Sequence, residues 1–352
     1  MSEHVKLSEV CEILNSNVDK KTKENEQKVK LCNFTDVYNN WAITKYTSKK
    51  FMKATATQNE INKFSLKKGY VAITKDSETK DDIGISTYIA DNFDNVLLGY
   101  HCTLLKPNQK VLNGKFLNAY LSSFYGKKYF SNCASGSGQR YTLTIDTIKD
   151  LNIPLINIET QQKIARTLSV LDKKIENNNK INELLHTLAY KIYEYYFKYK
   201  PKNAKLEQII IENPKSNIMV KNAQKTQDKY PFFTSGDNIL SYPKSIIDGR
   251  NCFLNTGGNA GIKFYVGKAS YSTDTWCICA NEFSDYLYLL LSSIKNHINQ
   301  SFFQGTSLKH LQKIYLKIIL FTCRLRMKLK NLIKLLCPYS RLYPLTQELL
   351  KN

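Results

Sequence analysis

The sequence contains 352 residues, enough for two domains of ordinary size. Hydrophobic residues make up 42% and charged residues 23%, a composition that supports buried cores and excludes wholesale disorder. The 51 Lys and Arg residues outnumber the 30 Asp and Glu residues, which gives a net charge of +21 at pH 7. Such a surplus favours a polyanionic partner, nucleic acid first of all, over compositional drift in a chain rich in Lys and Asn.

Nine cysteines are scattered along the chain without a Cys-x-x-Cys pair. The spacing of Cys277 and Cys279 is typical of a strand rather than of a zinc site, so no metal is expected. The N-terminal residues show no signal-peptide pattern, and no run of about 18 apolar residues could span a bilayer. We therefore expect a reduced, cytoplasmic protein without a membrane partner.

The first part of the chain, residues 1–155, contains short β-rich runs broken by Asn, Asp and Gly turns. The clearest runs are residues 69–74 and 96–105. A helix is predicted over residues 114–130, with Asn113 as its N-cap. These mixed elements predict a globular domain of the α/β (α+β) class.

A long helix is predicted within residues 156–200, because no Pro or Gly occurs between Glu159 and Tyr199. Its seam positions recur at alternating spacings of four and three, as in a coiled coil. An amphipathic helix lying on a globular core is the less favoured alternative, because so long a stripe would overhang a small domain. The seam residues are Ile164, Leu168, Leu171, Ile175, Asn178, Asn182, Leu185, Ala189, Ile192, Tyr196 and Tyr199.

The second part, residues 201–316, contains a similar mixture of predicted short strands and helices. Strands are predicted over residues 251–254, 262–266 and 275–279, and a helix over residues 285–297. Three echoes occur in the same order: residues 6–10 with 205–209, residues 121–123 with 291–293, and the apolar spacing Ile145, Ile148, Leu151, Ile153 with Leu308, Leu311, Ile314, Leu316. Together they predict a pseudo-two-fold duplicated unit of globule plus helix.

The last residues, 317–352, break this symmetry. A second spacer helix is expected there, yet the segment lacks sustained heptads and contains Pro338 and Pro344. It carries eight basic residues and one acidic residue. The abrupt change is typical of a reading-frame change, so we expect an aberrant basic tail in place of a second spacer helix.

The chain shows no catalytic constellation. Its Gly-rich loop, residues 257–261, lies between strand-like runs, whereas phosphate loops precede a helix. Asp19 and Glu26 faintly suggest a nuclease carboxylate pair, but their Lys/Glu-rich surroundings are typical of a solvated face. The five histidines have no metal or triad spacing. We expect a binding protein rather than an enzyme.

Two loops carry candidate DNA-binding residues. Residues 135–142 include Gln139 and Arg140, side-chain types that read adenine and guanine edges, and residues 303–310 are their counterpart. Ordinary helix-capping turns are the alternative. The predicted DNA-binding residues are Lys75, Ser137, Gln139, Arg140, Tyr141, Asn259, Lys263, Gln304, Thr306 and Lys309. The aromatic residues Tyr193, Tyr195, Tyr196 and Phe197 are predicted to pack rather than to stack on bases.

The chain resembles the specificity subunits of type I restriction-modification systems. Leu151-Asn-Ile-Pro-Leu155, Glu159-Thr-Gln-Gln-Lys-Ile-Ala165, Leu168-Ser-Val-Leu-Asp172 and Leu188-Ala-Tyr-Lys-Ile-Tyr193 resemble the central spacer helix of that family. Weaker matches are residues 258–265 with 272–275, and residues 31–39. The resemblance extends from the N-terminus to about Leu316.

The resemblance implies two target-recognition domains, each reading one half of a bipartite site in double-stranded DNA, held apart by long antiparallel helices. It implies no catalysis in the subunit itself. Methylation subunits would bind S-adenosylmethionine and modify adenine N6, and restriction subunits would use ATP and Mg²⁺, so no cofactor is expected in this chain.

Because the tail departs from the family pattern, we expect the central helix to recruit the same helix of a second copy. The homodimer would pair these helices antiparallel, with Asn178 and Asn182 near its centre. Two other interpretations remain open: a coiled-coil scaffold whose globular ends bind protein, and a homodimeric DNA-binding protein without an associated enzyme. The missing motifs disfavour a fused methyltransferase-nuclease.

Overall fold

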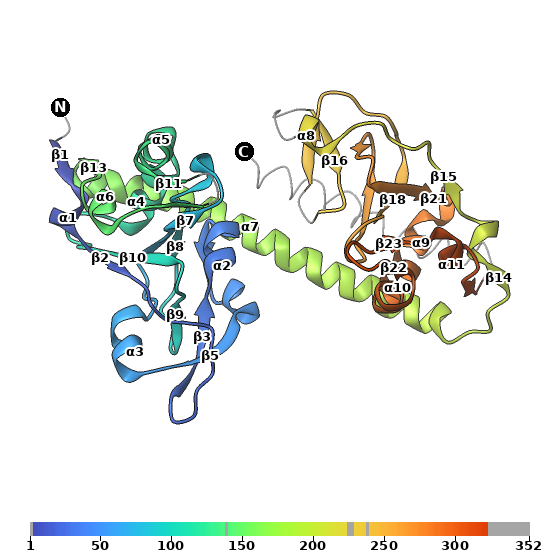
Figure 1. Cartoon of the computed structure of the whole chain (residues 1–352), viewed down its shortest axis with the longest axis horizontal. Coiled ribbons are helices and arrows are strands. Elements are labelled where there is room, and N and C mark those ends of the chain that lie inside the picture. The colour runs from blue at the N-terminus through green and yellow to red at the C-terminus, as the bar shows by residue number, and fades with distance from the viewer. Residues whose placement is uncertain (1–2, 138–139, 224–228, 237–238, 323–352) are drawn as a thin grey trace. The chain divides into compact units, whose positions relative to one another are not determined.

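The computed structural model describes residues 3–137, 140–223, 229–236 and 239–322 (Figure 1). The chain separates into two compact units, and the division falls between Glu176 and Asn177, inside the long helix α7 (Ile158–Tyr193). We call these units unit 1 and unit 2. Each combines small sheets with short helices, which confirms the mixed α and β class.

The core of unit 1 surrounds a five-stranded sheet with the order β2-β10-β6-β8-β4. Its strands β6 and β8 are buried along their whole length, because helices and other strands cover both faces. Only the pair β4–β8 is parallel in this sheet. The strands are β2 (Cys11–Asn15), β4 (Ala42–Ile43), β6 (Val71–Thr74), β8 (Ser86–Ile89) and β10 (Cys102–Pro107).

Three smaller sheets complete unit 1, with the orders β5-β3-β9, β11-β12-β7 and β1-β13. Their strands are β1 (Glu3–Lys6), β3 (Gln27–Cys32), β5 (Met52–Ala56), β7 (Asp76–Ser77), β9 (Val96–Leu98), β11 (Ser135–Ser137), β12 (Arg140–Thr142) and β13 (Asn152–Leu155). The predicted run over residues 96–105 is therefore two strands in different sheets. A turn at residues 99–101 separates them.

The helices of unit 1 are short. They are α1 (Leu7–Val10), α2 (Phe34–Asn39), α3 (Gln58–Phe64), α4 (Gly114–Ser122), α5 (Phe124–Cys133) and α6 (Ile145–Lys149), with the 3-10 turns η1 (Thr47–Lys50) and η2 (Lys80–Asp82). Asn113 caps α4 as predicted, since its Oδ1 accepts the N–H groups of Lys115 and Phe116. The predicted helix over residues 114–130 is interrupted, because Ser123 is extended and caps α5 instead.

Unit 2 is built on a four-stranded sheet with the order β15-β21-β18-β19. Its strands are β15 (Ile211–Glu212), β18 (Arg250–Asn255), β19 (Ile262–Val266) and β21 (Thr275–Cys279), which confirms the three strands predicted here. The smaller sheets use β14 (Ala204–Lys205), β16 (Tyr230–Phe233), β17 (Leu240–Tyr242), β20 (Ser270–Tyr271), β22 (Phe303–Gln304), β23 (His310–Leu311) and β24 (Leu320–Phe321).

The helical elements of unit 2 are η4 (Leu206–Gln208), α8 (Val220–Ala223), η5 (Asn281–Phe283), α9 (Ser284–Ser293), α10 (Lys295–Ser301) and α11 (Lys313–Lys317). The helix predicted over residues 285–297 is interrupted at Ile294, much as the corresponding helix of unit 1 is interrupted at Ser123. Among the described residues, no helix is both long and apolar enough to cross a membrane.

Helix α7 is continuous over 36 residues, as the heptad pattern predicts. In unit 1 it buries Gln161 and Ala165, and in unit 2 it buries Ala189 and Tyr193. The predicted seam is not the face that packs on unit 1, since Leu171 is 51% exposed. The π-helical turn η3 (Glu194–Lys198) extends α7 and buries Phe197. The predicted packing role is confirmed for Tyr193 and Phe197 and wrong for Tyr195 and Tyr196, which are exposed.

Matching hydrogen bonds reveal the duplication. The Leu7 N–H donates to the Leu151 carbonyl at 2.8 Å, and the Leu206 N–H donates to the Ile319 carbonyl at 2.9 Å. Leu7 and Leu206 are therefore equivalent, as the first echo predicts. The second echo also holds, because Ser123 and Ser293 each donate their hydroxyl, at 2.6 Å, to the carbonyl three residues earlier.

The third echo exists, but its predicted alignment is wrong by five residues. The partner of Ile145 is residue 313 and not Leu308. The Leu143 N–H donates to the Lys75 carbonyl at 2.8 Å, and the Leu311 N–H donates to the Thr256 carbonyl at 3.0 Å. Leu143 therefore corresponds to Leu311, and α6 corresponds to α11. The spacing of apolar residues allowed both alignments, because short apolar patterns repeat every few residues.

This correspondence places the end of unit 2 later than Leu316. Strand β24 pairs with β14, and Phe321 is buried in the core. Lys317 forms an ion pair with Glu212 at 2.5 Å, and this hydrogen bond lowers the pKa of the Glu212 carboxyl below its usual value. The predicted tail therefore cannot start at Lys317. Its remaining residues, 323–352, lie outside the described residues.

Candidate nucleic-acid interface

The hairpin β11–β12 of unit 1 brings Arg140 to two partners from other parts of the chain. Arg140 Nη2 lies 3.2 Å from Asp76 Oδ2 and 2.9 Å from His101 Nδ1. His101 Nδ1 also lies 2.7 Å from Asp76 Oδ2. Asp76 is the most buried of the three, with 15% of its side chain exposed, whereas the Arg140 side chain is 57% exposed. The carboxylate thus anchors a guanidinium that faces solvent.

Two further side chains extend this group. Lys75 Nζ lies 5.2 Å from the centre of the Tyr100 ring, a cation–π contact. The Tyr100 ring meets the edge of His101 with the ring centres 4.4 Å apart, and Tyr100 is 50% exposed. We call Lys75, Asp76, Tyr100, His101 and Arg140 the unit 1 cluster. It combines cations for phosphate, an exposed aromatic ring and a guanidinium that can read a base edge.

Backbone contacts fix the positions of these side chains. The Lys75 N–H donates to the His101 carbonyl at 3.1 Å, which ties the end of β6 to the turn before β10. Strand β12 pairs with β7 and places Thr142 opposite Asp76. Lys80 Nζ lies 5.5 Å from the centre of the ring of Tyr141, the residue that follows Arg140 on β12. The predicted residues Lys75 and Arg140 are therefore brought together, whereas Tyr141 packs partly buried against the hydrophobic core of unit 1.

Asp76, Tyr100 and His101 are not among the predicted site residues. Tyr100 and His101 lie in the run predicted as one strand, and Gly99 within that run is the sequence signal for a turn. In the structure, a Cβ on Gly99 would lie 2.7 Å from Asn33 Oδ1. Asp76 gave no local signal. Of the predicted loop residues, Gln139 lies outside the described residues, and so does the side chain of Ser137.

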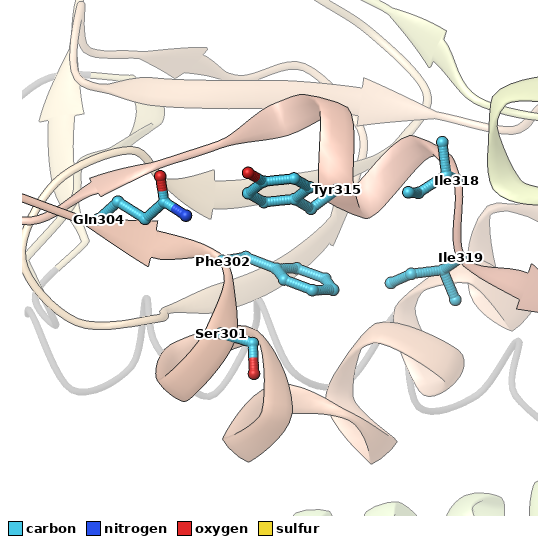
Figure 2. Close-up of a pocket in the computed structure, with 6 residues that line it drawn as sticks. All are labelled: Ser301, Phe302, Gln304, Tyr315, Ile318 and Ile319. Atoms are coloured by element: carbon cyan, nitrogen blue, oxygen red, sulfur yellow. The ribbon is translucent and has the colours of Figure 1, made fainter.

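The equivalent hairpin of unit 2, β22–β23, carries three predicted residues. Gln304, Thr306 and Lys309 are all exposed, together with every residue between Gln304 and His310. A pocket of about 340 Å³ lies at the base of this hairpin (Figure 2). It is lined by Ser301, Phe302, Gln304, Tyr315, Ile318 and Ile319, without a carboxylate, imidazole or thiol. Its chemistry is that of an apolar surface with two hydroxyls and one amide.

Two other predicted residues of unit 2 hold loops. Lys263 Nζ donates to the Thr234 and Gly236 carbonyls at 2.7 and 2.6 Å. The carbonyl of Asn259 accepts a hydrogen bond from Asn255 Nδ2 at 3.1 Å, although Asn259 itself is exposed. The geometry thus assigns the Lys263 ammonium to the loop that follows β16, and DNA contact by Lys263 and Asn259 stays a prediction.

We expect Lys263→Met to destabilise unit 2 by about 1.5–3 kcal/mol, the usual range for hydrogen bonds to a charged group. Urea denaturation of the full chain measures this loss. Lys268→Met, on an exposed position of the same unit, is the matched control and should change stability by less than about 0.5 kcal/mol. If Lys263→Met left stability intact and reduced only DNA affinity, the loop-holding role would be wrong.

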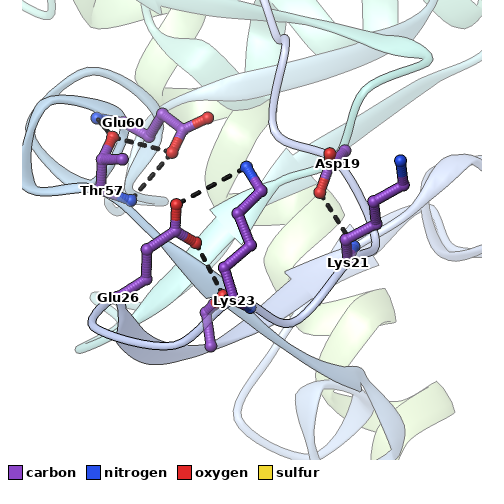
Figure 3. A network of polar contacts seen from close by, with 7 residues as sticks. Asp19, Lys21, Lys23, Glu26, Thr57 and Glu60 are labelled. Carbon is purple, nitrogen blue, oxygen red and sulfur yellow. Dashed lines mark hydrogen bonds and ion pairs between the residues drawn. The ribbon is translucent and has the colours of Figure 1, made fainter.

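The residues considered for a nuclease are not brought together. Glu26 Oε2 accepts the Thr55 hydroxyl at 2.7 Å and Glu26 Oε1 lies 3.6 Å from Lys23 Nζ, while Asp19 Oδ1 accepts the Lys21 N–H at 2.9 Å (Figure 3). Asp19 thus stabilises its own turn, and Glu26 joins its turn to strand β5. Within the part of the chain that the structure describes, no group of three or more His, Cys, Asp or Glu side chains could hold a metal ion.

Parts of this chain are similar in sequence to known proteins. The HindI specificity subunit of Haemophilus influenzae is 30% identical over 149 residues, which cover 42% of this chain and 32% of that subunit. The MjaIX specificity subunit of Methanocaldococcus jannaschii is 33% identical over 129 residues, covering 37% of this chain and 25% of that subunit. The chain therefore matches about a third or less of the length of these relatives.

A solved structure supports the fold. The crystal structure of a type I restriction-modification system S subunit from M. genitalium aligns over 100% of this chain and 95% of that one, with a TM-score of 0.52 and 15% identity. In addition, residues 2–187 match the family model of the type I restriction modification DNA specificity domain. Because this match covers more than half of the sequence, the chain belongs to the type I restriction modification DNA specificity domain family.

Proposed function

We propose that this chain is the DNA sequence-specificity subunit of a type I restriction-modification complex. Each unit would read one half of a bipartite site in double-stranded DNA through its exposed hairpin. The observation that supports this most is the unit 1 cluster, in which a buried carboxylate anchors the half-exposed Arg140 among Lys75 and Tyr100. Family membership and the net charge of +21 support the same function.

The catalytic partners would be separate chains. We propose that methylation subunits bring S-adenosylmethionine and that restriction subunits bring ATP and Mg²⁺, while this chain selects the DNA site and catalyses nothing. The cytoplasm, where such a complex would meet DNA, is the proposed location. Long exposed surfaces on α7, with Leu184 at 69% exposure, could be covered by such partners or by a second copy of the chain.

Co-expression tests the proposal. The chain is produced together with the methylation subunit encoded beside it, in a host that lacks other adenine methylation, and N6-methyladenine is mapped across the host DNA. We expect methylation at a single bipartite sequence, which disappears when this chain is omitted. Methylation that is absent, or that continues without this chain, would contradict the function.

We further expect the two halves of the site to be read separately. Exchange of residues 1–155 for the same region of a relative should change one half of the methylated sequence and leave the other half intact, because each unit carries its own hairpin. Methylation mapping measures both halves at once. A simultaneous change of both halves would exclude modular reading.

A homodimeric DNA-binding protein without an associated enzyme is the second candidate, favoured by the exposed apolar residues of α7. Pull-down of the tagged chain from the co-expressing host separates the candidates, since only the first predicts a stoichiometric methylation subunit. The salt dependence of binding distinguishes a coiled-coil scaffold that binds only protein. If the chain binds DNA, the logarithm of its binding constant should fall by about 0.9 per phosphate contact for each tenfold increase in salt concentration.

A further inference from the structure

The duplication identifies which residue of unit 2 occupies the place of Arg140. Gly136 has a φ of +151°, and a Cβ on it would lie 2.1 Å from the Arg140 carbonyl oxygen. Gly305 has a φ of +140°, and a Cβ on it would lie 2.3 Å from the Leu308 carbonyl oxygen. These two glycines therefore occupy the same point of the two hairpins, and Leu308 corresponds to Arg140.

Independent hydrogen bonds give the same alignment. Leu143 follows Arg140 by three residues, and its N–H donates to the Lys75 carbonyl. Leu311 follows Leu308 by three residues, and its N–H donates to the equivalent carbonyl, that of Thr256. Thr142 pairs with Asp76 in unit 1, and two positions after Leu308 the residue His310 bridges to Gly257. Gly257 thus stands where unit 1 has Asp76.

The turn beside the cluster corresponds as well. The Lys75 N–H donates to the His101 carbonyl, and the Thr256 N–H donates to the Asp274 carbonyl, both at 3.1 Å. Asp274 therefore stands where unit 1 has His101. Its carboxylate accepts the hydroxyl of Ser272 and so belongs to the turn.

The two units therefore differ at two equivalent positions that contact each other in unit 1. Unit 1 has the pair Arg140 and Asp76, whereas unit 2 has Leu308 and Gly257, so the guanidinium and its carboxylate are absent together. Leu308 is 56% exposed, an unusual place for a large apolar side chain on a polar, basic surface. The framework is kept while the chemistry at one exposed position changes from charged to apolar.

We propose that this position is the specificity-determining residue of each unit: Arg140 reads a guanine in one half-site, and Leu308 contacts a thymine methyl group in the other. The inference rests on the proposed function and adds the base that each hairpin selects. An arginine pairs with guanine O6 and N7, and an apolar side chain meets the thymine methyl group in the major groove. The two half-sites differ because these two side chains differ.

Asp76 is the positioning residue for Arg140. Its carboxylate and His101 both contact Nη2, and a guanidinium has five N–H donors, so Nη1 and Nε lie outside these contacts. A fixed guanidinium loses less conformational entropy on meeting a base than a flexible one. Loss of the carboxylate should therefore reduce base discrimination without reducing attraction to phosphate.

Selection from a pool of randomised DNA duplexes tests the proposal with the full chain. Arg140→Leu should abolish an about 5- to 150-fold preference for guanine at one position and leave the other half-site unchanged. Leu308→Ala should likewise reduce the preference for thymine over cytosine at one position of the other half-site. Lys128→Leu, on an exposed position of α5, is the matched control and should leave both preferences intact.

Asp76→Ala should lower the guanine preference while non-specific DNA affinity stays equal or rises, because a negative charge is removed. Asp76→Asn, which keeps an acceptor oxygen, should restore part of the preference. Damage to the fold would instead lower both affinities together, and circular dichroism of each variant checks the fold.

Unit 2 offers a gain-of-function test. A Cβ on Gly257 would have no atom closer than 4.0 Å, and its φ is not in the left-handed region, so Gly257→Asp is accommodated. The double variant Gly257→Asp, Leu308→Arg should convert the thymine preference at that position into a guanine preference, more strongly than Leu308→Arg alone.

The outcomes separate this inference from the proposed function. If the wild-type chain selects no sequence at all, the proposed function fails. If it selects a bipartite sequence and Arg140→Leu keeps the guanine preference, only the base assignment fails. A uniform loss of affinity across all sequences, with a smaller salt slope, would make Arg140 a phosphate contact and overturn the inference.

Discussion

Replacing Lys115 with Ala is expected to lower the free energy of unfolding of unit 1 by about 3–5 kcal/mol, because the change leaves the Asp172 carboxylate, of which only 18% is exposed, without its cation. Lys115 Nζ lies 2.5 Å from Asp172 Oδ2 and donates to the Ser169 hydroxyl at 2.9 Å. It also lies 4.9 Å from the centre of the Tyr88 ring. Only 7% of the Lys115 side chain is exposed.

This ion pair joins α4 to the first turns of α7, so its loss should also loosen that part of the spacer helix. Hydrogen exchange of the full chain, read peptide by peptide, should show faster exchange in residues 158–176 and little change in unit 2. Lys128→Ala is the control, because Lys128 is exposed and should cost less than about 0.5 kcal/mol. Combining Lys115→Met with Asp172→Leu should recover much of the stability, since no charge is then left unpaired.

A second contact explains why α7 begins where it does. The side chain of Gln161 is fully buried; it donates to the Val111 and Ile156 carbonyls at 2.9 and 2.7 Å and accepts the Asn113 N–H at 2.8 Å. Gln161 thus ties the start of α7 to the loop before α4. A polar residue buried at this depth is stable only because all of these bonds are made.

Local patterns predicted the framework well. The heptad spacing required only the sequence of α7, and the strands β19 and β21 are predicted from short strand-like runs of their own residues. The duplication was predictable because residues 6–10 and 205–209 resemble each other in sequence. The equivalent hydrogen bonds of Leu7 and Leu206 confirm it. These features depend on residues that are close in the sequence.

The features that escaped prediction depend on distant residues. Asp76 and His101 meet Arg140 from positions 64 and 39 residues away, and no spacing rule connects them. The face of α7 that packs on unit 1 was also missed. Gln161 and Ala165 are small or polar, so the apolar seam beside them gave the stronger periodic signal, although its residues Ile164 and Leu171 are exposed.

The exposed apolar side chains of α7 lead to the prediction with the clearest measurement, a homodimer of the isolated chain. Within the seam, Ile164 is 37% and Leu171 is 51% exposed. Beside the seam, Ile181, Leu184 and Leu188 are between 46% and 69% exposed. Apolar surface of this length is costly in water, at about 25 cal/mol per Å² left uncovered. A second copy of α7, paired antiparallel, would cover it and place Asn178 near the two-fold axis.

Sedimentation velocity measures the mass directly. The wild-type chain should sediment at twice 40.6 kDa at micromolar concentration, and Leu171→Lys should shift it to the monomer, because a charge would be buried in the seam. Thr187→Lys adds the same charge to an exposed position of α7 away from these apolar side chains and should leave the dimer intact. Circular dichroism of both variants separates dissociation from unfolding.

The methylation subunit provides the competing outcome. If partner helices of that subunit cover the seam in the complex, its addition should convert the dimer into a complex with one copy of this chain. A wild-type chain that is monomeric, and that Leu171→Lys does not change, would show that the seam is already covered within the single chain. In that case the apolar side chains of α7 would serve the fold rather than assembly, and exposure of Leu171 alone would not mark an interface.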